Sequence, residues 1–151
     1  RQARGVALQR VFQEMSPNLT RLRDWPERLD ALLRSRASVP FEWGRNDCCT
    51  FVADAIEAMT GRDVMESVRG YSTALQAQRL AHERGGLQAA VSGLLGDPVS
   101  PALVTVGDVL LLRHEDMELL TLCNGTSAIG PGPSGLVTLA APEVVAAWRV
   151  G

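Results

Sequence analysis

The segment WGRNDCCTFVADA, residues 43–55, carries the strongest signal for the fold of this chain. A glycine-containing turn leads into two adjacent cysteines, the first of them Cys48, and apolar residues then follow helical spacing until Gly61. Asn46 or Asp47 is placed to cap the start of this predicted helix. A thiol in the first turn lies near the positive end of the helix dipole and near unpaired backbone N–H groups, which lower its pKa. The segment therefore predicts a position suited to a nucleophile.

Length and composition indicate one globular domain. The chain has 151 residues, of which 46% are hydrophobic and 21% charged, enough for a single core. No apolar run approaches the length of a transmembrane helix, and the first residues do not have the pattern of a signal peptide. We therefore expect synthesis in the cytoplasm without a signal peptide. The net charge of -2 gives no overall attraction to nucleic acid or to anionic membranes.

The basic residues are concentrated near the start of the chain. All 15 are arginines, and eight of them precede Val39, against four acidic residues in the same stretch. Apolar residues between Arg4 and Met15 recur at helical spacing. We therefore predict a basic amphipathic arm over residues 1–23, followed by a domain over residues 24–151. Such an arm could dock on an acidic protein or contact a nucleic-acid backbone, and a solvated helix face explains the same pattern.

The cysteines and histidines do not predict a metal or cofactor site. Cys48 and Cys49 are adjacent and would form a disulfide only with strain, and Cys123 is far away in sequence. His82 and His114 stand apart, with no C-x-x-C motif near either of them. We expect three reduced thiols, no metal and no cofactor.

The order of the predicted elements favours an α+β domain. Helical patterns occupy the first two thirds of the chain and short apolar strands the last third. His114 lies in the connection of a predicted β-hairpin, and residues 125–135 are predicted to form a glycine- and proline-rich loop. The predicted helices cover residues 24–36, 48–60, 72–84 and 87–95, the predicted strands residues 108–113, 118–123 and 136–139, and a short helical turn residues 142–148.

Three short motifs in this order resemble the NlpC-type branch of the papain-like cysteine peptidases. They are Trp43-Gly44, Asp47-Cys48 at a helix start, and Gly107-Asp108-Val109 at a strand start. Members of that family cleave the peptide stems of bacterial peptidoglycan. The resemblance implies a papain-like domain with N-terminal helices packed on a small antiparallel sheet. It places Cys48 at the nucleophile position and Asp47 before it.

The chain is more specifically similar to small proteins encoded in phage and prophage tail gene clusters, which look like a diverged branch of the same fold. This resemblance implies a component of the virion tail, with tail hub or tail-tip proteins as partners. The residues that carry it are Asp24-Trp25-Pro26, Pro40-Phe41-Glu42-Trp43-Gly44, Asp47-Cys48-Cys49, Arg69-Gly70-Tyr71, Gly85-Gly86-Leu87 and Ala147-Trp148-Arg149-Val150.

The resemblance also predicts that the peptidase chemistry is lost. If Gly125 is matched to the glycine that ends the family's histidine strand, the histidine position falls at Leu119 and the orienting polar position near Gly130. Neither residue accepts a proton, and acyl transfer by a thiol needs a base. His114 is the candidate replacement, although it would need a shift of strand register to reach Cys48. His82 is predicted to be a solvent-exposed helix residue.

Two main functions follow from these predictions. The first is a structural or assembly protein of a phage or prophage tail, catalytically inactive because the histidine position is Leu119. The alternative is an active peptidoglycan endopeptidase in which Cys48 is the nucleophile and His114 the base. A third possibility is a nucleic-acid-contacting factor acting through the arginine-rich arm. For Cys48, simple packing and an inherited site are both open, whereas Asp108 is expected to make a hydrogen bond at the start of its strand.

Overall fold

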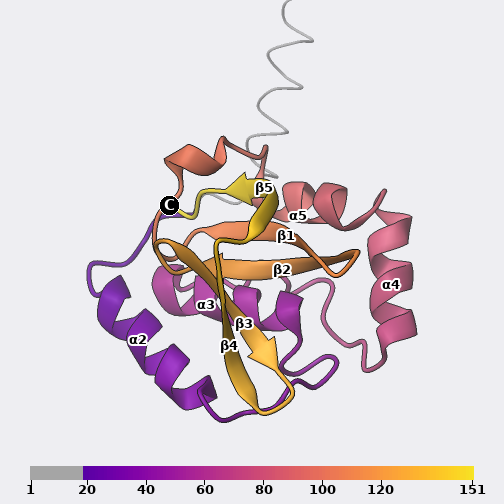
Figure 1. Cartoon of the computed structure of the whole chain (residues 1–151), viewed down its shortest axis with the longest axis horizontal. Coiled ribbons are helices and arrows are strands. Elements are labelled where there is room, and N and C mark those ends of the chain that lie inside the picture. Colours follow the sequence, from indigo (N-terminus) through magenta and orange to yellow (C-terminus); the bar gives the residue numbers. More distant parts are fainter. Residues whose placement is uncertain (1–18) are drawn as a thin grey trace, which may run out of the picture.

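The structure, a computed structural model, describes residues 19–151 and confirms the α+β class (Figure 1). Within these residues the helices come first and an antiparallel sheet follows, as predicted. The helices are α2 (Trp25–Arg36), α3 (Cys48–Thr60), α4 (Ala74–Glu83), α5 (Leu87–Leu95) and the short 3₁₀ helix η1 (Pro101–Leu103). The strands are β1 (Val109–His114), β2 (Met117–Cys123), β3 (Ser127–Gly132), β4 (Gly135–Ala140) and β5 (Glu143–Trp148).

The five strands form one sheet in the order β4-β3-β2-β1-β5, with every neighbouring pair antiparallel. The predicted hairpin between β1 and β2 is confirmed. Its two turn residues, Glu115 and Asp116, have φ values of 51° and 62°. Positive φ at both central residues is the geometry of a two-residue hairpin turn that suits twisted strands.

Two predictions in the last quarter of the chain are wrong. Residues 125–135 contain β3 rather than only a loop, and residues 142–148 contain β5 rather than a helical turn. Gly130 and Pro131 have low intrinsic strand preference, yet β3 pairs along its length with β4. The short apolar run of β5 fits a helix or a strand equally well, and pairing with β1 decides it.

The side chains of the sheet alternate between two faces, and α3 covers one of them. Leu111 and Leu120 lie in the same buried cluster as Phe51 and Ile56 of α3. Leu110 belongs to a separate cluster on the other face, together with Leu112, Cys123, Ala128 and Ala147. Figure 1 shows α2 beside α3 and the β3–β4 hairpin, with α4 at the opposite side of the molecule. α3 thus packs with one face on the sheet and lies beside α2.

The domain begins before residue 24. Arg21 donates hydrogen bonds to Val150, Val106 and Asp108, and the Leu22 N–H donates to the Met59 carbonyl. The predicted boundary at residue 23 is therefore too late, because Leu19, Arg21 and Leu22 belong to the predicted arm but pack on the domain. The rest of the predicted arm, residues 1–18, lies outside the described residues.

Candidate functional site

Asp47 is the structural centre of the turn that precedes Cys48. It is the N-cap of α3, and its Oδ1 accepts a hydrogen bond from the Thr50 N–H at 2.9 Å. The Thr50 hydroxyl in turn accepts one from the Asp47 N–H at 2.9 Å, which completes a capping box. The Gly44 N–H donates to Oδ2 at 2.8 Å and the Tyr71 hydroxyl to Oδ1 at 3.0 Å. Asp47 is buried, and its hydrogen bonds hold three segments together.

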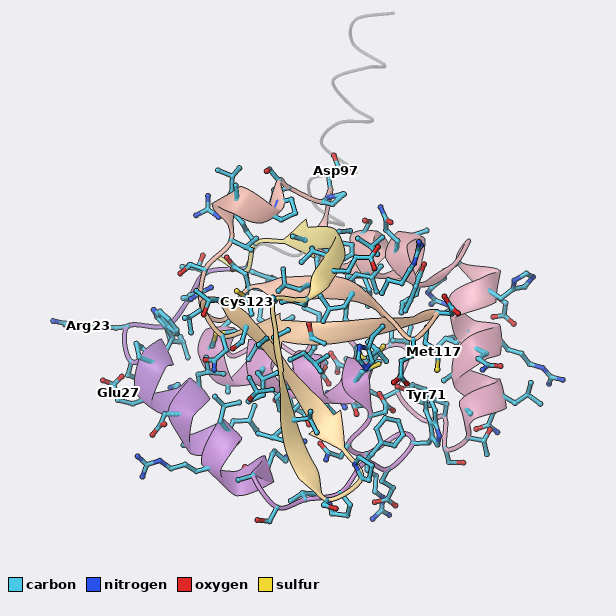
Figure 2. All side chains as sticks on the ribbon, viewed as in Figure 1. Arg23, Glu27, Tyr71, Asp97, Met117 and Cys123 are labelled. Carbon is cyan, nitrogen blue, oxygen red and sulfur yellow. The ribbon has the colours of Figure 1, made fainter. Side chains whose placement is uncertain are left out.

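Gly44 and Tyr71 meet although they are far apart in the sequence. Gly44 has φ of 82°, and a Cβ on it would lie 2.0 Å from the Tyr71 carbonyl oxygen. Only glycine therefore fits this position. Tyr71 is half-buried, and burial together with the neighbouring Asp47 carboxylate raises its pKa, so the hydroxyl keeps its proton and remains a donor. Figure 2 shows Tyr71 on the side of the molecule that carries α4.

Cys48 is the first residue of α3 and is half-buried. Its Sγ lies 3.9 Å from the Sγ of Cys49. A hydrogen bond from the Cys49 thiol lowers the pKa of Cys48, burial opposes this, and the Leu120 backbone adds a further lowering contribution. The Cys49 pKa is raised well above its usual range by its hydrogen bond to Cys48 and by burial. Cys48 is thus the member of the pair that ionises first, and its hydrogen bond with Cys49 is the main cause.

The strand that faces Cys48 offers it no proton acceptor. Leu120 and Leu122 of β2 point toward α3, as shown by their place in the same buried cluster as Phe51. Leu119 occupies the alternate position in the strand and points to the other face of the sheet. The expectation that Leu119 lies opposite Cys48 is therefore wrong by one residue, and Leu120 takes that place.

Gly130 also lies on the far face. A Cβ on Gly130 would contact the Thr121 methyl group at 3.8 Å, and Thr121 pairs with Leu110, which belongs to the cluster on the face away from α3. The sequence match could not determine the face of the sheet on which Leu119 and Gly130 lie, because a slip of one residue reverses the face of every side chain in a strand.

Neither histidine is brought to Cys48. His114 ends β1, shares its face with Leu112, and lies 3.9 Å from the Glu115 carboxylate at the hairpin turn. His82 is exposed in the last turn of α4. Among the described residues, the groups that shift the pKa of Cys48 include no imidazole. The three predicted site residues thus separate into a neighbouring pair, Asp47 and Cys48, and a distant His114.

Asp108 makes the expected hydrogen bonds at a strand start, and they are structural. Its buried carboxylate accepts from the Val150 N–H and the Thr105 N–H, and it pairs with Arg21 at 2.8 Å. The Arg21 guanidinium also lies 4.3 Å from the centre of the Trp25 ring. Sequence reasoning missed Arg21, whose only local signal was its place in a basic stretch.

A second ionic network lies around α3. Arg69 pairs with Asp54 at 2.7 Å and with Asp63 at 2.8 Å, and Asp54 also pairs with Arg36 at the end of α2. The Arg36 guanidinium donates to Asn46 at 2.8 Å, directly before the α3 cap. These pairs connect segments distant in sequence, so local spacing gave no sign of them. Through the hydrogen bond between Arg36 and Asn46, this network also stabilises the turn before Cys48.

An apolar cavity of about 90 Å³ adjoins Cys49, between α3, α4 and α5. Cys49, Tyr71 and Leu120 lie on its wall, together with apolar side chains of the three helices. Sequence reasoning did not predict this cavity, because its wall comes from five segments: α3, residues 64–71, α4, α5 and β2. The Asp47, Cys48 and Cys49 donor atoms form the group in the described chain that could hold a metal ion, and these atoms all lie within 4.8 Å of one another.

Comparison with known proteins gives a family without a known activity. No helix within residues 19–151 is long and apolar enough to cross a membrane. No match was found among curated proteins. Residues 20–150 match the family described as "Domain of unknown function (DUF6950)", and this range includes Arg21, which packs on the domain. The chain belongs to the DUF6950 family.

Proposed function

We propose that the protein is a structural or assembly component of a phage or prophage tail, built on a peptidase-like scaffold that lacks a catalytic base. One observation carries the loss of catalysis: Leu120, an aliphatic residue, faces Cys48 where a base would be needed. The tail setting is supported by the sequence resemblance described above. Tail hub or tail-tip proteins are the proposed partners, and the virion tail is the proposed location.

Chemistry supports this proposal over peptide cleavage. Attack on an amide requires a base to hold the thiolate and then an acid to protonate the leaving amine. The helix start and the Cys49 thiol favour the Cys48 thiolate, but neither delivers a proton to a leaving group at neutral pH. The Cys49 thiol has a raised pKa and is a poor acid. Asp47 already accepts three hydrogen bonds and orients no imidazole.

The motifs that carry the tail resemblance are structural in this chain. Asp47, Gly44 and Tyr71 lock together around the α3 cap, and Arg69 joins the ionic network of Asp54. Trp148 is fully buried, and its indole N–H donates to the Ser92 hydroxyl at 3.1 Å. Motif residues with scaffold roles are expected of a domain that is retained for its shape.

The test is complementation in the phage or prophage that encodes the protein. Deletion of the gene is expected to abolish normal tails in electron micrographs, and both the wild-type gene and Cys48→Ala are expected to restore tails and infectivity fully. Cys123→Ala serves as the control for loss of an unrelated thiol. Normal tails in the deletion strain would contradict the structural role. Failure of a folded Cys48→Ala protein to restore infection would contradict the non-catalytic role.

The alternative, an active peptidoglycan endopeptidase, is favoured by one observation. The Cys48 pKa is lowered, as in a reactive thiol. Within the described chain this alternative lacks a base, so a second protein would have to supply it. It predicts cleavage of peptidoglycan that depends on Cys48.

A further inference from the structure

We propose that Asp47, Cys48 and Cys49 form a binding site for a soft divalent cation of the zinc type. The site is independent of the proposed tail function. It rests on three donor atoms from consecutive residues at the start of α3, all within 4.8 Å of one another.

The spacing of the two sulfur atoms fits one metal ion. Two thiolates on a tetrahedral zinc ion lie about 2.3 Å from the metal, and therefore about 3.8 Å from each other. The Cys48 and Cys49 sulfur atoms are 3.9 Å apart. An intramolecular disulfide does not fit as well, because adjacent Cα atoms lie about 3.8 Å apart, closer than the usual range for a disulfide. The pair is thus spaced for a bridging ion rather than for a bond between the sulfurs.

Asp47 supplies an oriented oxygen as the third ligand. Within residues 19–151 its Oδ2 accepts a single hydrogen bond, from the Gly44 N–H, which leaves a lone pair on that atom. Its Oδ1 is held by the Thr50 N–H and the Tyr71 hydroxyl. Metal-binding carboxylates are commonly held by hydrogen bonds of this kind. A tetrahedral zinc ion bound by one carboxylate oxygen and one thiolate sets the two ligand atoms about 3.6 Å apart. The three donor atoms of the proposed site already lie within 4.8 Å of one another.

The chemistry of the donors selects the cation. Two thiolates favour Zn²⁺ or Cd²⁺ over Mg²⁺ or Ca²⁺, which prefer oxygen ligands. Two thiolates and a carboxylate carry a charge of about -3, and a divalent ion reduces the repulsion among them. Three protein ligands leave the fourth tetrahedral position open to a small exchangeable ligand. The apolar cavity beside Cys49 limits the access of water to one side of the site.

The direct test titrates the purified full-length chain, reduced and freed of metal, with Cd²⁺ and Zn²⁺. The expected result is one ion per chain by elemental analysis, with the thiolate-to-cadmium charge-transfer absorption reaching its maximum at one equivalent. Cys48→Ser and Cys49→Ser are each expected to weaken binding at least ~10-fold, whereas Cys123→Ser binds as the wild type does. Cys123 is the matched control, because it belongs to the cluster on the face of the sheet away from α3. It ends β2, at the opposite end of that strand from Met117 (Figure 2).

A second measurement needs no variant at the site. Zn²⁺ is expected to slow alkylation of Cys48 and Cys49 in the wild-type protein, read by mass spectrometry, and to leave the rate at Cys123 unchanged.

Tyr71→Phe removes one hydrogen bond to Asp47 and is expected to weaken Cd²⁺ binding ~10-fold. The proposal is overturned by no retained ion, by full binding in Cys48→Ser or Cys49→Ser, or by equal protection of all three cysteines.

Discussion

At the scale of single residues, the neighbours Asp47 and Cys48 differ in their structural roles and in their exposure to solvent. Asp47 is buried and fixes the turn, whereas Cys48 is half-buried and carries the shifted pKa. The sequence predicted the position of both residues, because a cap and a helical repeat are local features. It could not predict that Leu120, rather than Leu119, faces Cys48, since strand register depends on pairing with distant residues.

Substitution of Asp47 tests its structural role. Asp47→Ala removes the α3 cap and leaves buried donors without an acceptor, so the free energy of unfolding is expected to fall by about 2–4 kcal/mol. Urea denaturation measures this change. Asp97→Ala, at an exposed position, is the control and is expected to unfold as the wild type does. An equal effect of the two substitutions would contradict the assignment.

The pH dependence of alkylation tests the thiol pair. Because the pKa of Cys48 is lowered and that of Cys49 raised, Cys48 is expected to ionise at a lower pH than Cys49 and to react fastest with iodoacetamide in metal-free buffer. The midpoint of its rate profile should lie below that of a free thiol. Cys49→Ala removes the hydrogen-bond donor, so the midpoint should rise. A faster reaction at Cys123, whose pKa is raised by burial, would contradict this order.

At the scale of elements, the helices were more predictable than the strands. Proline in the first turn of α2 and Gly61 after α3 are local signals, and both helices begin or end where these residues predict. The strands β3 and β5 depend on pairing partners, so their glycine, proline and alanine residues gave no local signal of a strand. The cavity wall and the ion pairs of Asp54 likewise combine segments that are distant in the sequence, so local sequence patterns did not predict them.

The turn before α3 is expected to tolerate no side chain at Gly44. Gly44→Ala combines a positive φ with a Cβ 2.0 Å from the Tyr71 carbonyl oxygen. We expect a loss of more than about 2 kcal/mol in the free energy of unfolding. Gly93→Ala, in α5 with no atom within 4 Å of the new Cβ, should instead stabilise the protein by about 0.5–1 kcal/mol. Thermal and urea unfolding of both variants provide the comparison, and equal destabilisation would contradict the account.

At the scale of the whole molecule, Arg21 and Asp108 connect the first described residues of the domain to the segment that follows β5. Arg21 bonds to Asp108 and to the Val150 carbonyl, while Asp108 accepts the Val150 N–H. A chain that starts at residue 24 loses Arg21 and leaves the Asp108 charge buried without its partner. The free energy of unfolding is expected to be about 3–5 kcal/mol lower than that of a chain of residues 19–151. Its thermal midpoint should therefore lie far below that of the longer chain. Equal midpoints would place the domain boundary at residue 24 after all.

The central claim concerns the whole molecule as well: it is the proposal that the scaffold is peptidase-like and that its Cys48 thiol has no base within residues 19–151. The most direct test incubates the purified wild-type chain with isolated peptidoglycan from its host and measures released muropeptides by liquid chromatography and mass spectrometry. Cys48→Ala and Cys123→Ala are measured beside it. The account predicts that all three release no more than a protein-free blank. Release by the wild type and Cys123→Ala that is absent in Cys48→Ala would contradict it.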